Sequence, residues 1–351
     1  MNDLERLVNY YAAGRLFLPR PRYLCFNATL RCDGHCGHCG IWKEKPTGVE
    51  LGASDLGRVL AGALFQKVET AWITGGEPTL RDDLGELAAA MASSLSALCT
   101  LGLATNGLDP DRVIARVKAM RGALDPARHG LFAHLSLDGT GAIHDQVRGR
   151  PGAFAAVAET LSRLVKLRDD NPAARIEIGL NCVIQPGNVA GLDDLFAFAR
   201  GRGLPLMFNV VLVTDQIYRN QSMGAALAFS DDDRRRVIAF LDRIAPESPA
   251  PFRYQYGIIK EVLRGGTRPR RCLTLFTTIN INADGSLFPC PAASDLFPKN
   301  VLKEDVEKLW SGGEARDMRR RIAREFCPTC MLSCSLGDSM PAGEWVRGGW
   351  E

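Results

Sequence analysis

Three cysteines lie close together near the start of the chain, at Cys32, Cys36 and Cys39, with the spacing C-x3-C-x2-C. Three thiolates at this spacing can surround one [4Fe–4S] cube, which a fourth cysteine would close. The remaining iron is then open to a ligand that is not protein, as in catalytic rather than structural metal sites. The alternative is a zinc knuckle completed by His35 or His38. The triplet alone therefore indicates an open iron–sulfur site or a zinc site.

A second group of cysteines lies near the other end of the chain, at Cys272, Cys290, Cys327, Cys330 and Cys334. Four thiolates are enough to close a [4Fe–4S] cluster. The same spacing also fits a zinc ribbon with four cysteine ligands. Three further cysteines fall within expected strands and are expected to be small core residues, namely Cys25, Cys99 and Cys182.

The elements that must position these residues alternate between short apolar runs and helical patterns. Strands are expected at 22–27, 68–74, 97–104, 130–139, 175–184 and 205–213. Helices are expected at 53–65, 82–95, 110–120, 154–168, 192–200, 230–244 and 255–263. This alternation predicts an α/β fold with a parallel sheet, helices outside it and right-handed crossovers. Six such strands predict a partial (β/α)6 barrel with its active groups at the carboxyl ends of the strands.

Four polar or glycine-rich stretches follow the first four strands. They are the cysteine loop, Gly75-Gly76-Glu77-Pro78, Thr105-Asn106-Gly107 and Ser136-Leu137-Asp138-Gly139. The arrangement resembles the radical S-adenosylmethionine (SAM) enzymes, whose open iron chelates the methionine end of SAM. In that family the reduced cluster cleaves SAM to a 5′-deoxyadenosyl radical. One departure is His38, which stands where the family usually has an aromatic residue, although an imidazole can also pack against adenine. The resemblance favours iron over zinc.

The resemblance also implies which residues meet SAM. The two glycines would let the backbone approach the ligand, and Glu77 with the strand-end backbone would receive the SAM ammonium. Arg148 would pair with the SAM carboxylate, or alternatively form a salt bridge with Asp145. The implied SAM-binding set is Gly75, Gly76, Glu77, Pro78, Asn106, Ser136, Asp138, Arg148, Asn181 and His38. Asn181 and Asn209 are equally interpretable as satisfied polar residues in the barrel mouth.

The C-terminal region resembles the auxiliary-cluster domains of the same family. Residues 279–290 alternate apolar positions around Asp284-Gly285, which predicts a β-hairpin. The longer form, called SPASM, has seven cysteines and two clusters, whereas five cysteines fit the shorter "twitch" form with one. The implied ligands of an auxiliary [4Fe–4S] cluster are Cys272, Cys290, Cys327 and either Cys330 or Cys334.

Five segments follow from these patterns. We expect a helical lead-in at 1–21, the partial barrel at 22–225, a helical linker at 226–265, a small cysteine-rich α+β auxiliary domain at 266–340 and a tail at 341–351. Gly265-Gly266 marks the expected boundary before the auxiliary domain.

Composition excludes several classes of protein. The 351 residues are 46% hydrophobic and 24% charged, with a small net charge of +3, which is ordinary for a soluble globular protein. The basic runs are short and lie in helical sequence, so we expect no nucleic-acid partner. Eleven cysteines without a secretory signal favour reduced thiols, metal ligation and a cytoplasmic location. The most apolar long stretch, 87–104, reads as a helix and a strand, so we expect no membrane association.

The resemblance implies a radical SAM oxidoreductase or lyase that uses SAM, two clusters and an electron donor such as flavodoxin or ferredoxin. Residues 1–20 leave no room for a winged-helix peptide-recognition domain. We therefore expect a small polar metabolite of a specialised pathway as substrate, a sugar, aminocyclitol or nucleoside intermediate. Oxidation is the expected reaction, with decarboxylation, dehydration or epimerisation still open. The alternatives are a maturase that crosslinks or epimerises a ribosomal peptide, and a non-catalytic zinc-stabilised binding protein. Candidate substrate contacts are Asn209, Tyr218, Arg253, Tyr254 and Tyr256.

Overall fold

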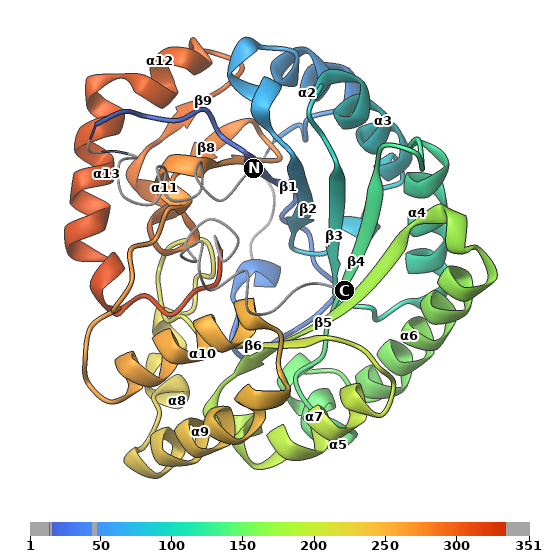
Figure 1. Ribbon diagram of the computed structural model, residues 1–351, viewed down its shortest axis with the longest axis vertical. Helices are drawn as coiled ribbons and strands as arrows, with labels where there is room; N and C mark the ends of the chain where they lie inside the picture. Colours follow the sequence, from blue (N-terminus) through green and yellow to red (C-terminus); the bar gives the residue numbers. More distant parts are fainter. Residues whose placement is uncertain (1–13, 15, 44–47, 335–351) are drawn as a thin grey trace.

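The computed structural model describes residues 14, 16–43 and 48–334, and it is built around one curved sheet (Figure 1). Within these residues the sheet has the strand order β6-β5-β4-β3-β2-β1-β7-β8-β9. Neighbouring strands from β6 to β7 are parallel, and β8 and β9 follow antiparallel. The bounds are β1 Tyr23–Thr29, β2 Thr70–Gly75, β3 Thr100–Thr105, β4 Gly130–Ser136, β5 Ile176–Ile184, β6 Leu206–Val210, β7 Thr278–Asn282, β8 Ser286–Phe288 and β9 Lys299–Asn300.

Helices return the chain between the parallel strands. Figure 1 shows α2, α3, α4 and α6 along the outside of the curved sheet. The bounds are α2 Ala53–Leu60, α3 Leu84–Ser94, α4 Pro110–Gly122, α5 Ala142–Arg148, α6 Ala153–Asp170, α7 Leu192–Arg200, α8 Gly224–Leu227, α9 Asp231–Ile244, α10 Ala250–Leu263, α11 Thr274–Thr277, α12 Val306–Ser311 and α13 Gly313–Glu325. No helix among the described residues has the length and apolarity that a membrane crossing requires.

Alternation along the strands separates the helix-covered core from the inside of the barrel. In β1, Leu24 and Phe26 have no exposed surface and belong to the main hydrophobic core, whereas Cys25 is half-buried. Inside the barrel, Trp72 and Phe132 meet edge to face with ring centroids 5.6 Å apart. Gly102 lies between them in register, and a Cβ there would approach the Trp72 ring to 2.4 Å. The glycine therefore makes room for the rings that fill this part of the barrel.

The structure confirms the α/β fold class and the predicted alternation of strands and helices. Each of the six predicted barrel strands is found, with bounds shifted by a few residues, and the helix predicted at 192–200 coincides with α7. One difference is α10, which begins at Ala250, before the start of the helix predicted at 255–263 and next to Pro249 and Pro251. Prolines are compatible with the first turn of a helix, where the N–H has no partner, so they do not prevent this start. Residues 16–20 are not helical, contrary to the predicted lead-in, and 1–13 lie outside the described residues.

The C-terminal region shares the sheet of the barrel. The predicted hairpin is present as β7 and β8, with Gly285 at a φ of +82°. However, β7 pairs in parallel with β1, and the Asn27 side chain donates to Asn282 Oδ1 at 2.7 Å. The predicted boundary at 265–266 thus separates two segments that contribute to one sheet. The predicted tail at 341–351, and the end of the predicted auxiliary domain from 335, lie outside the described residues.

Candidate active site

The cysteine loop leaves the carboxyl end of β1 and curls around Gly34. A Cβ at Gly34 would lie 3.7 Å from Cys32 Sγ and 3.6 Å from Cys36 Sγ, so two sulfurs flank the same backbone position. The Cys39 N–H donates to the Cys36 carbonyl at 3.2 Å, and the charge of Cys36 acts on the Cys39 thiol. Burial raises the pKa of Cys32 to about 12 and that of Cys39 to about 11. Thiols in this setting are deprotonated by metal binding, and three of them fit the open ligand set of a [4Fe–4S] cluster.

One side of the loop is fixed by α5, a helix that the strand and helix patterns did not predict. The Gly37 N–H donates to the Val147 carbonyl at 3.0 Å, and the His35 N–H donates to the Arg148 carbonyl at 3.1 Å. Gly149 has a φ of +60°, and a Cβ there would lie 2.4 Å from the His35 carbonyl oxygen. A glycine is therefore needed at the point where α5 ends against the cysteine loop.

The other side of the loop is held by the segment after β6, which lacked any periodic signal in the sequence. The Gly40 N–H donates to the Tyr218 carbonyl at 2.6 Å. The side chain of Asn220, which has no exposed surface, donates to the His38 carbonyl at 2.7 Å. A Cβ at Gly40 would lie 2.3 Å from the Arg219 carbonyl oxygen, so only glycine fits. Sequence reasoning missed Asn220 because a single polar residue in an irregular segment carries no local signal.

The Gly75-Gly76 turn after β2 packs directly against the chain that enters the cysteine loop. Gly75 has a φ of +131°, and a Cβ there would lie 2.1 Å from the Thr29 carbonyl oxygen. A Cβ at Gly76 would lie 2.3 Å from the Arg31 carbonyl oxygen. The Gly76 N–H donates to Thr29 and the Glu77 N–H to Arg31, both at 2.8 Å. The glycines thus admit the neighbouring backbone, which is a structural reason beyond the expected approach of a ligand.

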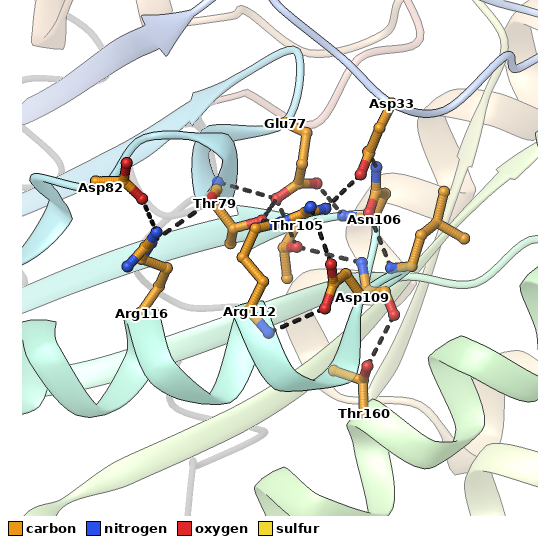
Figure 2. Close-up of polar contacts among 12 residues, drawn as sticks. Asp33, Glu77, Thr79, Asp82, Thr105, Asn106, Asp109, Arg112, Arg116 and Thr160 are labelled. Atoms are coloured by element: carbon orange, nitrogen blue, oxygen red, sulfur yellow. Dashed lines mark hydrogen bonds and ion pairs between the residues drawn. The ribbon is translucent and has the colours of Figure 1, made fainter.

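Glu77 connects the ends of β2 and β3, and Figure 2 shows its carboxylate surrounded by donors. Oε1 accepts from the Thr79 N–H at 3.1 Å, the Thr79 hydroxyl at 2.5 Å and the Thr105 hydroxyl at 2.8 Å. Oε2 accepts from the Asn106 N–H at 2.7 Å. Burial raises the pKa of Glu77, whereas the four donors favour its ionised form. Glu77 therefore links the end of β2 to the end of β3 through hydrogen bonds. Its contact with the SAM ammonium stays a prediction.

Asn106 and Arg112 tie the cysteine loop to the end of β3 and to α4 (Figure 2). The Asn106 side chain donates to Asp33 Oδ1 at 2.8 Å, and its oxygen accepts from the Leu108 N–H at 2.9 Å. Arg112 forms an ion pair with Asp33 and a second one, at 3.0 Å, with Asp109. The amide of Asn106, which the resemblance placed at the cofactor, is thus already used to hold the loop.

Arg148 and Asp138 form a buried ion pair beside the cysteine loop. Arg148 Nη2 lies 2.6 Å from Asp138 Oδ2, and the side chains are 7% and 0% exposed. Burial disfavours the charge of Asp138, but the neighbouring guanidinium outweighs it and holds the pKa of that carboxyl below its usual value. The salt bridge between Arg148 and Asp145, one of the two predicted options, is wrong. Asp145 instead accepts two backbone N–H groups, of Gly152 at 2.8 Å and of Phe154 at 2.7 Å, at the start of α6.

A cavity of about 210 Å³ opens between the two cysteine groups at the carboxyl ends of β5 and β6. Asn209 donates to Asn181 Oδ1 at 2.7 Å across these strands, and both line the cavity. Ser136 lies next to Asn181 in register but is not part of the lining. Burial lowers the pKa of His38 to about 4, so this lining imidazole is neutral at pH 7. The described lining has no lysine or arginine; it is His38, Cys39, Asn181, Val183, Asn209, Val210, Val211, Leu212, Tyr218, Leu332, Ser333 and Cys334.

Two of the five predicted substrate contacts, Asn209 and Tyr218, line this cavity, and the three on α10 do not. Tyr256 has no exposed surface and packs against Phe208, with ring centroids 6.4 Å apart. Tyr254 is 9% exposed and packs within α10. Arg253 donates to the Ser248 carbonyl at 2.7 Å. Tyr256 therefore lies in the core and not at the cavity, and a substrate contact by it stays a prediction.

All five C-terminal cysteines line one further cavity, next to α13. Burial, together with the charges of Cys272 and Cys330, raises the pKa of Cys327 to about 12. Cys290 lies within electrostatic reach of Cys272, Cys330 and Cys327. Within the part of the chain that the structure describes, no three His, Cys, Asp or Glu side chains converge on a single-ion site. Four thiols around one shared space are enough to hold a [4Fe–4S] cluster.

Comparisons with known proteins agree with this geometry. The family model of the radical SAM superfamily matches residues 26–188. A GTP 3',8-cyclase of Synechococcus sp. (strain CC9902) is 35% identical over 313 residues, which cover 82% of this chain and 87% of that protein. The chain belongs to the radical SAM superfamily. A second model, the iron-sulfur cluster-binding SPASM domain, matches residues 272–334. The cofactors of this radical SAM protein are therefore SAM, a SAM-binding [4Fe–4S] cluster and an auxiliary [4Fe–4S] cluster.

Other relatives cover the chain at lower identity. A PqqA peptide cyclase of Granulibacter bethesdensis is 24% identical over 90% of this chain and 79% of its own length. The subtilosin biosynthesis protein AlbA of Bacillus subtilis is 27% identical over 89% of this chain and 64% of its own length. A pre-heme d1 synthase of Dinoroseobacter shibae is 30% identical, but the match spans only 42% of that protein.

Two solved structures show the same fold. The protein anSMEcpe with bound AdoMet and a Kp18Cys peptide has a TM-score of 0.61 at 18% identity, covering 85% of this chain and 82% of that one. Streptococcus suis SuiB bound to the precursor peptide SuiA has a TM-score of 0.59 at 17% identity, covering 86% of this chain and 67% of that one.

Proposed function

We propose that this radical SAM enzyme is a peptide maturase, which modifies an unactivated carbon of a peptide side chain or backbone. The observation that carries the proposal is the cavity between the two cysteine groups. Its described lining combines aliphatic side chains with neutral polar ones and includes no cationic side chain. Two relatives that cover about nine tenths of the chain are named for peptide cyclisation and for bacteriocin biosynthesis. This evidence supports the peptide alternative more than the small polar metabolite that the sequence favoured.

The barrel residues take the following roles in this proposal. Cys32, Cys36 and Cys39 hold the first cluster, which, with SAM, supplies the radical that removes a hydrogen atom from the substrate. The strand-end backbone at Gly75 and Gly76 meets the methionine end of SAM, as the resemblance implies. Asn181, Asn209 and His38 line the side of the cavity where the nucleoside would lie. The hydrogen-bonded asparagines keep this wall polar, while exclusion of water by the aliphatic wall protects a radical from side reactions.

The auxiliary ligands proposed are Cys272, Cys290, Cys327 and Cys330. All four line the same cavity, and the charges of Cys272 and Cys330 act on both Cys290 and Cys327, which supports this set. The charges of Cys330, Cys272 and Cys290 act on Cys334 as well, but Cys334 also lines the cavity proposed for the substrate. We therefore assign Cys334 to the boundary between the auxiliary cluster and the substrate.

A nucleotide is the second candidate substrate, because the relative that is 35% identical is named a GTP 3',8-cyclase. A triphosphate is normally bound by arginine or lysine side chains through charge-assisted hydrogen bonds. The described cavity lining has neither. The chemistry of the cavity therefore favours a peptide with an apolar side chain over a triphosphate.

The test is anaerobic incubation of the reconstituted enzyme with SAM, a chemical reductant and one of three substrate pools: short peptides, GTP, or sugars and aminocyclitols. The expected result is deoxyadenosine release that only the peptides stimulate, with a product that has lost hydrogen. The variant Leu212→Arg places a cation in the cavity wall and should reduce peptide turnover, whereas Leu302→Arg, at a 47% exposed position, should not. Release that only GTP or only a sugar stimulates would overturn the peptide proposal.

A further inference from the structure

Arg148 contacts a thiol of the cysteine triplet as well as Asp138. Its Nη1 donates to Cys36 Sγ at 3.5 Å, while its Nη2 lies 2.6 Å from Asp138 Oδ2. Arg148 is 6% exposed and Asp138 is 1% exposed, so both charges lie away from solvent. Cys36 is itself buried, at 7% exposed. The guanidinium therefore bridges a fixed carboxylate and a sulfur that belongs to the proposed cluster ligands.

Asp138 is held on several sides, which fixes the direction of the guanidinium. Its Oδ1 accepts from the Val183 N–H on β5 at 2.8 Å. Its own N–H donates to His144 Nδ1 at 3.0 Å, and its carbonyl accepts from the Asn188 side chain at 2.9 Å. Because β5, α5 and the segment after β5 fix the position of Asp138, its carboxylate holds the Arg148 guanidinium in place.

Hydrogen bonds and positive charge at cluster sulfurs raise the reduction potential of iron–sulfur clusters, because they stabilise the additional electron. A buried charge acts strongly, since little water lies between it and the sulfur to screen it. A carboxylate next to the guanidinium opposes this effect by reducing the net positive charge. The two members of the pair therefore act on the cluster with opposite signs.

We infer that the Arg148–Asp138 pair sets the reduction potential of the SAM-binding cluster, with Arg148 raising it through Cys36 and Asp138 limiting the rise. Both are positioning residues in this role, because they act through a ligand rather than on the substrate. The role is separate from the predicted contact between Arg148 and the SAM carboxylate, since it exists before SAM binds. It is also independent of the proposed peptide substrate.

The test is an anaerobic redox titration of the reconstituted enzyme without SAM or substrate, followed by electron paramagnetic resonance. The signal of the barrel cluster is identified afterwards as the one that changes when SAM is added. Arg148→Gln should shift its midpoint to a more negative potential, and Asp138→Asn should shift it to a more positive one. The matched control is Arg31→Gln, which removes an arginine adjacent to Cys32 whose half-exposed guanidinium points to Glu50, at 3.1 Å. It should leave the midpoint close to that of the unmodified enzyme.

Iron and sulfide contents show whether each variant retains both clusters. If Arg148→Gln fails to hold its cluster, the Arg148→Lys variant is measured in its place. Lysine keeps the positive charge, so the midpoint potential should shift less far in the negative direction. Shifts of the same sign in the Arg148 and Asp138 variants would overturn the inference, because a purely structural pair has no reason to separate the signs. An unchanged midpoint combined with weaker SAM binding would also overturn it, and would assign Arg148 to the SAM carboxylate alone.

Discussion

Replacing Glu77 by glutamine tests whether this residue is mainly a structural connection or mainly a ligand of SAM. The carboxylate accepts four hydrogen bonds, and two of them come from backbone N–H groups on opposite oxygens, those of Thr79 and Asn106. A glutamine amide has only one oxygen. Whichever way the amide is turned, one of these two N–H groups meets an NH2 group and stays without an acceptor.

The magnitude follows from this single unmet donor. A buried N–H that loses its acceptor costs about 1–3 kcal/mol. The threonine hydroxyls can rotate and become acceptors, so their contribution changes less. Glutamine also removes a buried carboxylate whose pKa is raised by burial, and this offsets part of the lost stability. We therefore expect Glu77→Gln to lower the free energy of unfolding by about 2 kcal/mol.

The measurement is anaerobic denaturant unfolding of the reconstituted enzyme, followed by circular dichroism, together with calorimetric titration of SAM. The control is Glu86→Gln, an exposed glutamate in the first turn of α3, which should change the stability by less than about 0.5 kcal/mol. A normal unfolding midpoint with strongly weakened SAM binding would refute the structural reasoning. That result would instead support a direct contact between Glu77 and the SAM ammonium.

Three further predictions concern the clusters and acid stability. Cys39→Ala should abolish deoxyadenosine release from SAM, and a variant that still released it would contradict the ligand assignment. Iron analysis of Cys330→Ala should show loss of the auxiliary cluster, whereas Cys334→Ala should keep that iron and lose product formation; the reverse pattern would exchange their roles. Burial lowers the pKa of His134 and His144 to about 4, from 6.5 when unfolded. The unfolded chain therefore binds more protons, and stability should be lost as the pH falls from about 6.5 to 4. His144→Gln should reduce the stability lost between pH 6.5 and 4 by roughly 3 kcal/mol in unfolding experiments, and an unchanged loss would show that His144 titrates normally.

The sequence by itself determined the local elements and the type of chemistry. The six barrel strands and most of their helices follow from hydrophobic periodicity, which is set by residues a few positions apart. The two cysteine groups are readable for the same reason, because the spacing of Cys32, Cys36 and Cys39 already limits which metal centre they can hold. The sequence also indicated the functional importance of Gly75 and Gly76, but not that the backbone of Thr29 and Arg31 packs against them.

Only the tertiary structure decided which of these residues meet. The pairing of β7 with β1 joins segments about 250 residues apart, and a strand contains no local signal for a parallel neighbour so distant. Proximity in sequence suggested Asp145 as one of two possible partners of Arg148, and it gave no indication of Asp138. In the fold, Asp145 caps α6 and Asp138 lies at the end of β4, opposite the guanidinium. Charge pairs and buried donors depend on where strands end in space, and that is fixed by packing of the whole barrel rather than by any one stretch of chain.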